Sequence, residues 1–328
     1  MKKRLIWTSA IVSSVLTASA TVVGIVVGII ASNRIMYVKK KDDQLILERE
    51  ITAKRYDEAW YANVPKSEQW IESDNGYPIK AIFLEPHNTN RYVIICHGVT
   101  ESKVNSFRFA RMFEHLGFNS VVYDHRRHGD SGGKTTSFGH FEKLDLKAVV
   151  KALELHVGPD LFFGIHGESM GAATTLLYGG MEDTANFYIS DCAYSDISDQ
   201  ILHVMRTTTP LRTTLALRLA SLFMKMRDGY SIATVSPRET VKNIKNPVLF
   251  IHSINDDFVL PKMSEELFAL KQGPKELKLF SEGAHAQSFN KNPEEYEETV
   301  AEFLMKYGLL TPNQKEIPMS SSVNFTST

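Results

Sequence analysis

The sequence contains little cysteine and has almost no net charge. It has two cysteines in 328 residues and a formal net charge of −1 at pH 7. So few cysteines exclude a disulfide-rich secreted scaffold, and the absence of a C-x-x-C pair argues against a redox or structural zinc motif. Basic residues are scattered, so no nucleic-acid footprint appears. The remaining composition, 43% hydrophobic, fits one large α/β domain with an appendage.

The longest uncharged run lies at the N-terminus. Three basic residues at 2–4 precede residues 5–31, a run of 27 residues without a charge. As a helix this run spans roughly 40 Å, which is enough to cross a bilayer. Ala18-Ser19-Ala20 resembles a signal-peptidase site, but the apolar run continues past it, which favours an uncleaved anchor over 1–34. Basic residues flank both ends, and the short basic head favours a single-pass protein with an extracytoplasmic domain.

A strand-like segment leads into Gly167-Glu168-Ser169-Met170-Gly171, and small residues follow. A chance occurrence of this pattern would be a plain loop, but here it stands between a strand and a helix. Such a sharp turn pushes the serine side chain out of the backbone path. Glycines suit its flanks, because a side chain there would clash across the turn. Ser169 is therefore the candidate nucleophile.

Two later residues complete a possible catalytic triad. Asp256 follows the apolar segment 247–252, and His285 follows the segment 276–280. Functional groups in parallel sheets gather at the carboxyl ends of strands. We therefore predict Asp256 as the acid and His285 as the base. Asp191 and Asp257 are rival carboxylates.

An oxyanion requires backbone N–H donors close to the nucleophile. Met170 directly follows the serine and is expected to supply one of them. The strand-like segment 91–96 leads into His97-Gly98, so we expect Val99 to supply the other, with Thr100 as the neighbouring possibility. His97 itself is expected to bond to nearby backbone.

These motifs together resemble the α/β-hydrolase superfamily. The segment 124–131, the serine turn, the Asp256 segment and Gly283-Ala284-His285 are similar to bacterial membrane-anchored members of its serine-aminopeptidase-like and esterase branch. The resemblance covers about residues 68–308. It implies hydrolysis of esters, thioesters or amides without metal or organic cofactor. Two positions depart from the family pattern, since Arg127 and Ser253 replace glycines.

The resemblance and the alternation of strand-like and helix-like segments predict the fold. We expect an α/β-hydrolase fold, with a mostly parallel eight-stranded sheet covered by helices on both faces. Asp74-Asn75-Gly76 predicts a hairpin turn before it. The expected organisation is a juxtamembrane helical stalk over 35–66, the hydrolase domain over 67–308 and a disordered tail over 309–328.

Residues 197–242 interrupt this alternation at the place where the family inserts a helical cap. The segment is rich in leucine and methionine, which suit a pliable apolar pocket. We predict Phe223 and Met224 as substrate-binding residues of an acyl pocket. A purely structural helical pair is an equally good interpretation.

The segment after 120–123 places His125 and His128 beside Asp124 and Asp130. Such a group can bind metal, but charges that pair with one another are the better interpretation. We therefore expect no metal site and no cofactor. The expected partners are a small-molecule acyl ester and, through the N-terminal helix, a membrane.

The expected activity is that of a serine hydrolase of carboxylic esters with short to medium apolar acyl groups, acting through an acyl-enzyme. A peptidase, amidase or acyltransferase would use the same triad. A protein of another class, a membrane-tethered binding protein, could carry the triad idle.

Overall fold

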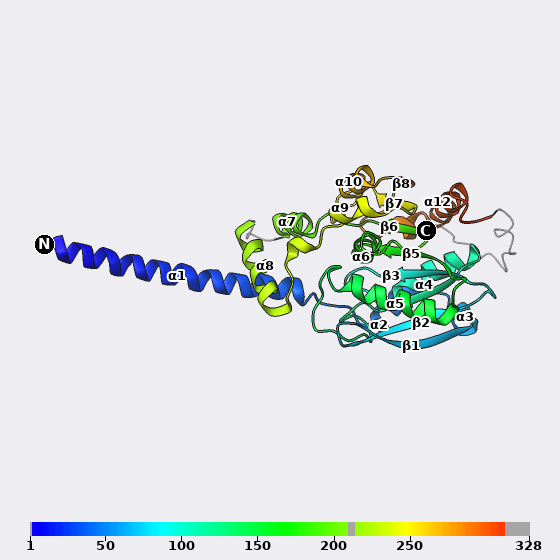
Figure 1. Ribbon diagram of the computed structural model, residues 1–328, viewed down its shortest axis with the longest axis horizontal. Helices are drawn as coiled ribbons and strands as arrows, with labels where there is room; N and C mark the ends of the chain where they lie inside the picture. Colours follow the sequence, from blue (N-terminus) through cyan, green and yellow to red (C-terminus); the bar gives the residue numbers. More distant parts are fainter. Residues whose placement is uncertain (1, 209–213, 312–328) are drawn as a thin grey trace. The chain divides into compact units, whose positions relative to one another are not determined.

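An eight-stranded sheet organises most of the chain in the computed structural model, which describes residues 2–208 and 214–311 (Figure 1). The sheet order is β1-β2-β4-β3-β5-β6-β7-β8. β2 pairs antiparallel with β1 and β4, and the other neighbouring strands pair in parallel. This confirms the predicted mostly parallel sheet. The strands are β1 (Lys66–Glu72), β2 (Pro78–Leu84), β3 (Arg91–Cys96), β4 (Asn119–Tyr123), β5 (Phe162–Glu168), β6 (Phe187–Asp191), β7 (Val248–Ser253) and β8 (Lys275–Phe280).

The expected hairpin joins β1 and β2. Glu72 pairs with Pro78 at its end, and Gly76 takes a φ of 77°, which glycine adopts without strain. The antiparallel pair forms one edge of the sheet, so the parallel strands that carry the serine turn lie further inside.

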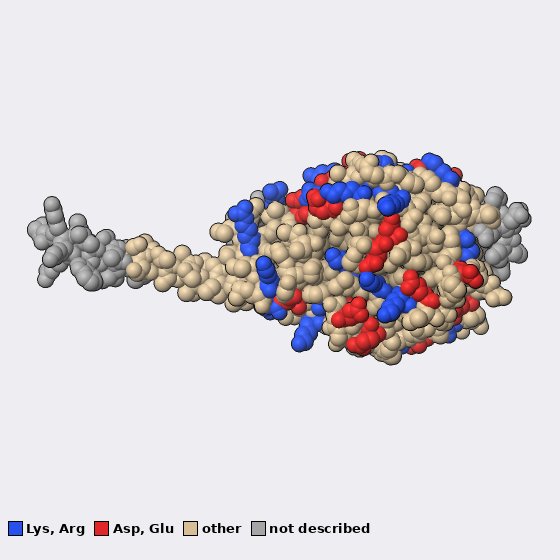
Figure 2. Space-filling model, viewed as in Figure 1, with Lys and Arg blue, Asp and Glu red and all other residues tan. Residues whose placement is uncertain are grey.

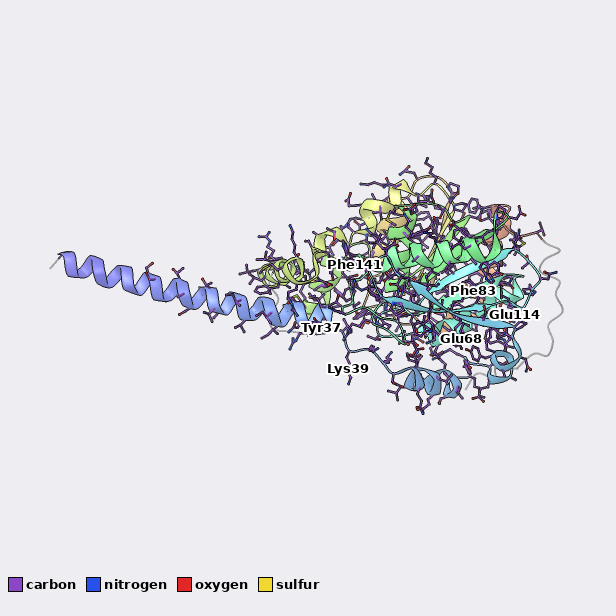
Figure 3. The ribbon with its side chains drawn as sticks, turned by 60° about the horizontal axis from the view of Figure 1, so that its bottom comes forward. Tyr37, Lys39, Glu68, Phe83, Glu114 and Phe141 are labelled. Atoms are coloured by element: carbon purple, nitrogen blue, oxygen red, sulfur yellow. The ribbon has the colours of Figure 1, made fainter. Side chains whose placement is uncertain are left out.

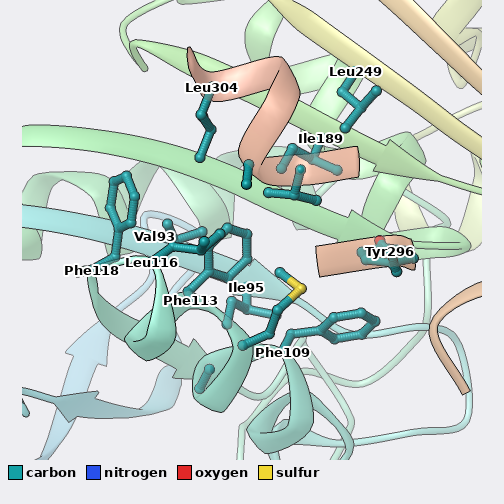
Figure 4. Packing of buried hydrophobic residues seen from close by; sticks show 14 of the residues in the cluster. Val93, Ile95, Phe109, Phe113, Leu116, Phe118, Ile189, Leu249, Tyr296 and Leu304 are labelled. Carbon is teal, nitrogen blue, oxygen red and sulfur yellow. The ribbon is translucent and has the colours of Figure 1, made fainter. Parts of the chain in front are cut away.

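Helices lie on both faces of the sheet (Figure 1). On one face, aromatic and aliphatic side chains of α4 and α12 interlock with alternate residues of the strands (Figure 4). Phe109 and Phe113 of α4 and Tyr296 of α12 are buried there. The main helices of this part are α4 (Lys103–His115), α5 (Glu142–Val157), α6 (Met170–Gly179), α10 (Lys262–Leu270) and α12 (Pro293–Lys306).

The chain divides into two compact units. One, here the helical unit, comprises Met1–Val38 and Ile197–Val235, and the other, here the sheet unit, comprises Lys39–Asp196 and Ser236–Thr328. Tyr37 and Lys39 stand on either side of this boundary along the chain (Figure 3).

The segment expected as a stalk forms two helices of the sheet unit, α2 (Asp43–Thr52) and α3 (Glu58–Asn63). The chain turns between them because Asp57 caps α3 by accepting a bond from the Trp60 N–H. Ile46 of α2 is fully buried, and buried Glu50 accepts bonds from the Arg55 guanidinium. This segment is therefore packed against the sheet unit.

The helical unit contains α1 (Lys2–Met36), α7 (Ile197–Thr208) and α8 (Thr214–Asp228). α7 and α8 form the helical insertion expected between β6 and β7. Among the described helices, α1 alone is long and apolar enough to cross a membrane, with a mean hydropathy of 1.8 over Leu16–Met36. A signal sequence would have the same length and composition.

The expected tail begins next to the core. Leu310 is buried in the sheet unit, and residues 312–328 of that tail lie outside the described residues.

Candidate active site

Ser169 occupies the sharp turn between β5 and α6. Its φ of 55° and ψ of −115° are unusual for a residue with a side chain, and its N–H donates to the Asp191 carbonyl oxygen at 2.8 Å. The flanking glycines are sterically required. A Cβ on Gly167 would stand 2.3 Å from the Gly171 oxygen, and one on Gly171 would stand 2.0 Å from the Cys96 oxygen. The backbone therefore holds Ser169 in a strained turn of the kind that presents a nucleophile.

Ser169, His285 and Asp256 form one hydrogen-bonded chain. Ser169 Oγ lies 2.8 Å from His285 Nε2, and His285 Nδ1 lies 2.7 Å from Asp256 Oδ2. Because Nδ1–H donates to the carboxylate, Nε2 carries the lone pair and accepts the serine proton. The structure thus brings the three predicted residues together in one hydrogen-bonded chain.

Asp256 is buried and held by four donors. Its Oδ1 accepts from the Phe258 and Val259 N–H groups at 3.0 and 2.9 Å, and its Oδ2 accepts from His285 and from His252 Nε2 at 3.1 Å. Burial alone would raise the pKa of Asp256, but the bonds from the two histidines outweigh it and lower that pKa to about 2. The carboxylate is therefore ionised and fixed in direction.

His252 is a residue of the site that the sequence analysis did not assign. Its Nδ1 lies 2.7 Å from Ser264 Oγ, and its Nε2 is shared between Asp256 and the Val259 carbonyl oxygen at 2.8 Å. Since a carbonyl oxygen only accepts, Nε2 carries the proton and Ser264 donates to Nδ1. His252 therefore donates a hydrogen bond to Asp256 Oδ2 and helps to hold the carboxylate in place. Its position at the end of β7, four residues before Asp256, was the available signal.

The loop after β3 lies against the serine turn. A Cβ on Gly98 would stand 3.6 Å from Ser169 Cβ. The Thr100 N–H already donates to His128 Nε2 at 3.2 Å, so the alternative oxyanion donor is engaged. This leaves Val99, together with Met170 at the start of α6, as the candidate donor pair.

The rings of two buried histidines, His97 and His128, hold that loop by hydrogen bonds. His97 Nδ1 donates to the Gly98 oxygen at 2.7 Å, and its Nε2 accepts from the His125 N–H at 3.0 Å. Burial lowers the pKa of His97 to about 4 and that of His128 to about 3. Both rings are therefore neutral at pH 7. His97 bonds to nearby backbone, as expected.

The rival carboxylates differ from Asp256 in their surroundings. Asp257 is exposed. Asp191 is buried and accepts from Tyr296 Oη at 3.1 Å and Ser288 Oγ at 3.3 Å. Burial, with the nearby Glu168 carboxylate, raises the pKa of Asp191 to about 8. A carboxyl that is mostly protonated at pH 7 is poorly suited to stabilise an imidazolium.

The acidic residues of the segment after β4 pair with a lysine. Lys103 Nζ lies 2.8 Å from Asp124, 2.9 Å from Asp130 and 3.1 Å from Asp43. The lysine ammonium thus faces all three carboxylates. Lys103 belongs to α4, so the acidic groups of this segment pair with a cation from outside the segment and not with one another as expected.

The two predicted pocket residues belong to the helical unit. The Phe223 ring lies against α1, because a Cβ on Gly28 would stand 2.4 Å from it, and Met224 is buried. Phe223 therefore serves helix packing, a contact that was not foreseen. A role of either residue in an acyl pocket stays a prediction.

Known proteins resemble this chain along most of its length. The family described as serine aminopeptidase, S33, matches residues 87–234. YqkD of Bacillus subtilis, described as an uncharacterized protein, is 42% identical, and the match covers 93% of this chain and 97% of YqkD. Lysophospholipase L2 of Escherichia coli is 25% identical over 52% of each chain.

Solved structures show the same architecture. Esterase Pf2001 of Pyrococcus furiosus has a TM-score of 0.60 at 23% identity, and the match covers 76% of this chain and 96% of the esterase. At that identity the likeness shows the fold alone. The sheet order and the relatives agree, and the chain belongs to the α/β-hydrolase superfamily.

Proposed function

We propose that this hydrolase is a membrane-anchored serine esterase that uses Ser169, His285 and Asp256 as its catalytic triad. The observation that carries the proposal is the continuous hydrogen-bonded chain from Ser169 Oγ through His285 to Asp256, with distances of 2.8 and 2.7 Å. Serine and histidine at these distances are within reach for proton transfer.

The first half of the reaction forms an acyl-enzyme. Ser169 Oγ attacks the ester carbonyl carbon while its proton passes to His285 Nε2, and Asp256 stabilises the resulting imidazolium. The N–H groups of Val99 and Met170 hold the negative oxygen of the tetrahedral intermediate. When this intermediate collapses, the C–O bond to the alcohol breaks and the alcohol takes the proton from His285.

The second half releases the acid. His285 Nε2 removes a proton from water, the hydroxide oxygen attacks the acyl carbon, and a second tetrahedral intermediate forms at the same donors. Its collapse returns the proton to Ser169 Oγ. Asp256 stays ionised throughout, which fits the lowering of its pKa to about 2.

Esters with short to medium apolar acyl groups are the proposed substrates. The helical insertion is rich in leucine and methionine, which favours apolar acyl groups. The esterase and lysophospholipase names of the similar proteins support ester bonds as the target. α1 is proposed to anchor the chain, with the sheet unit on the extracytoplasmic side.

The test is a substrate panel on the purified full-length protein in detergent. Chromogenic esters of increasing acyl length should be hydrolysed, each buried methylene contributing up to about 0.8 kcal/mol until the pocket is full. Ser169→Ala is the matched control. Strong cleavage of aminoacyl amides with negligible ester turnover would overturn the esterase proposal in favour of a peptidase, the function that the serine aminopeptidase family favours.

A fluorophosphonate probe tests whether the triad is active at all. An active serine should be labelled in the unaltered protein and not in Ser169→Ala. Failure to label the unaltered protein, together with an inactive panel, would favour a membrane-tethered binding protein with an idle triad. An acyltransferase would label but transfer the acyl group to an added alcohol in preference to water.

A further inference from the structure

Helix α8 packs along the C-terminal half of α1, and the two helices run in parallel. Leu219 lies 4.0 Å from the Cβ position of Gly24, and the Phe223 ring lies on Gly28. One turn further, Arg227 donates to Asn33 Oδ1 at 2.6 Å and to Ser32 Oγ at 3.2 Å. Each contact is one helical turn further along both helices, so α8 covers α1 from Gly24 onward.

The stretch of α1 from Leu16 to Val23, just before Gly24, is uncovered. Leu16, Val22 and Val23 are 65%, 59% and 61% exposed. The hydroxyls of Thr17 and Thr21 donate to backbone oxygens one turn earlier in the helix, so they carry no unsatisfied donor into an apolar surrounding. This stretch of α1 is therefore suited to lipid.

Charge decides which part of α1 crosses the bilayer. Residues 5–24 contain no charge, and as a helix these 20 residues span about 30 Å, the thickness of the hydrocarbon layer. The alternative span, Leu16–Met36, would take Arg34 and the Arg227–Asn33 contact into that layer, which is costly. The bilayer surface then lies close to Gly24.

At that level α8 exposes an apolar face that also carries basic charge. Leu215 and Leu222 are 62% and 52% exposed, and Arg218 between them is exposed as well. Lys225 follows in the last turn. Figure 2 shows Lys and Arg side chains on the part of the helical unit that contains α7 and α8, next to an uncharged stretch of α1. Apolar side chains with adjacent cations suit the boundary between acyl chains and phosphates, where the cation can stay in the polar layer.

We infer that Leu215, Arg218 and Leu222 of α8 form a contact surface for an anionic phospholipid bilayer. Leu215 lies one turn before Leu219, so it reaches just below the level of Gly24 into the outer acyl region. The aliphatic part of the Arg218 side chain can lie in the acyl region beside Leu215 while the guanidinium stays among the phosphates. The apolar face is continuous with the uncovered stretch of α1 from Leu16 to Val23, which is why a bilayer fits this surface. The inference rests on the membrane anchoring proposed above.

Depth measurements on single labelled cysteines test this inference. Both native cysteines are buried, so an added cysteine can be labelled selectively. Leu215→Cys and Leu222→Cys, two independent reporters, receive a nitroxide in the full-length protein in nanodiscs of phosphatidylcholine, with or without phosphatidylglycerol. Leu16→Cys is the control inside the span, and Leu155→Cys, at a side chain that is 79% exposed on α5, is the control in water.

The expected result is a label at position 215 that lies about 5–10 Å on the acyl side of the phosphates, shallower than the label at 16. Arg218→Gln should move it toward water in the anionic nanodiscs, whereas Lys54→Gln on the sheet unit should not. A label at 215 as accessible to water as that at 155, or as deep as that at 16, would overturn the inference. Shielding from both lipid and water would instead indicate a second copy of the chain on α8.

The same samples separate this inference from the proposals on which it rests. Ester hydrolysis measured in the nanodiscs reports on the triad alone. An active protein with a water-exposed label at 215 and a lipid-embedded label at 16 refutes only the surface. A label at 16 outside the lipid refutes the anchor, and the surface with it.

Discussion

The serine site and the helical unit differ in how their residues are brought together. At the serine site, each predicted residue lies in the turn or loop after a strand, and because β5, β7 and β8 are parallel all three lie at the carboxyl ends of these strands. In the helical unit, α1 packs against α8 although the segment Lys39–Asp196 of the sheet unit lies between them in sequence.

This difference shows which contacts a sequence can reveal. A strand, a tight turn and a reactive side chain form a short pattern, and sheet topology does the rest. Packing between two helices that are distant in sequence depends on complementary surfaces, here Gly28 and the Phe223 ring. Neither residue by itself identifies the other as its contact.

Removal of the nucleophile or the base should have the largest effect. Ser169→Ala and His285→Ala should each lower kcat/KM for an ester by a factor on the order of 10³ or more, because neither attack nor proton transfer can then proceed. Circular dichroism should show an unaltered fold. Full activity in either variant would show that these residues, although brought together by the sheet, do not form the catalytic site.

Variants of the candidate acids should show whether the catalytic carboxylate follows β7, as Asp256 does, or ends β6, as Asp191 does. Asp256→Asn should be severely impaired, because the amide no longer stabilises the imidazolium, whereas Asp191→Asn and Asp257→Asn should be milder. Ester hydrolysis by the three purified variants checks this. If Asp191→Asn were the inactive variant, the acid would belong to β6 and the assignment to β7 would be wrong.

Asp191 also predicts a pH dependence of stability. Its pKa is raised to about 8, so its favourable contribution is present below the unfolded value near 4 and is lost as pH rises through 8. Asp191→Asn removes this loss, and its stability relative to the unaltered protein should grow by up to about 1.4 kcal/mol per pH unit between those values. Thermal melts at pH 5 and pH 8 measure the difference, and an equal gap at both would contradict the raised pKa.

A larger residue at Gly28 should loosen the helical unit and leave the serine site intact. A side chain there meets the Phe223 ring, so Gly28→Leu should cost about 1–3 kcal/mol of packing between α1 and α8. Limited proteolysis in detergent should cleave residues 197–235 faster, while hydrolysis of a soluble ester changes little. Val26→Leu, at an exposed position on α1, is the matched control. Unchanged protection in Gly28→Leu would show that the helix contact contributes nothing.

The smallest effect is expected at His252. His252→Gln removes one bond to an ionised carboxylate, worth about 1.5 kcal/mol, or about tenfold in kcat with KM unchanged. Asp256 then lacks the hydrogen bond from His252, so more of its negative charge acts on His285. The acidic limb of the pH–rate profile should therefore move to higher pH. Ser264→Ala should shift it less and in the same direction. A lower melting temperature without any change in the profile would mean that His252 is only structural.

Much of the sheet unit was predictable, because its signals are local. The turn around Ser169 and the hairpin at Gly76 follow from backbone requirements that few residues satisfy. The packing of the 35–66 segment was less accessible. Its charges are typical of a solvated helix, yet Ile46 and Glu50 are buried, and Glu50 lies 4.0 Å from Arg108, a residue distant in sequence. The spacing places His252 near Asp256, but the hydrogen bond between them also depends on the orientation of both side chains, which spacing alone does not specify.

The parallel contact of α1 with α8 also has a consequence for synthesis of the chain. At about 5–20 residues per second, α8 leaves the ribosome roughly 10–40 s after α1. During that interval the surface of α1 at Gly24 and Gly28 lacks Leu219 and Phe223, which cover it in the finished protein. A nascent chain that stops within the sheet unit therefore presents a different α1 surface to its surroundings than the finished protein does.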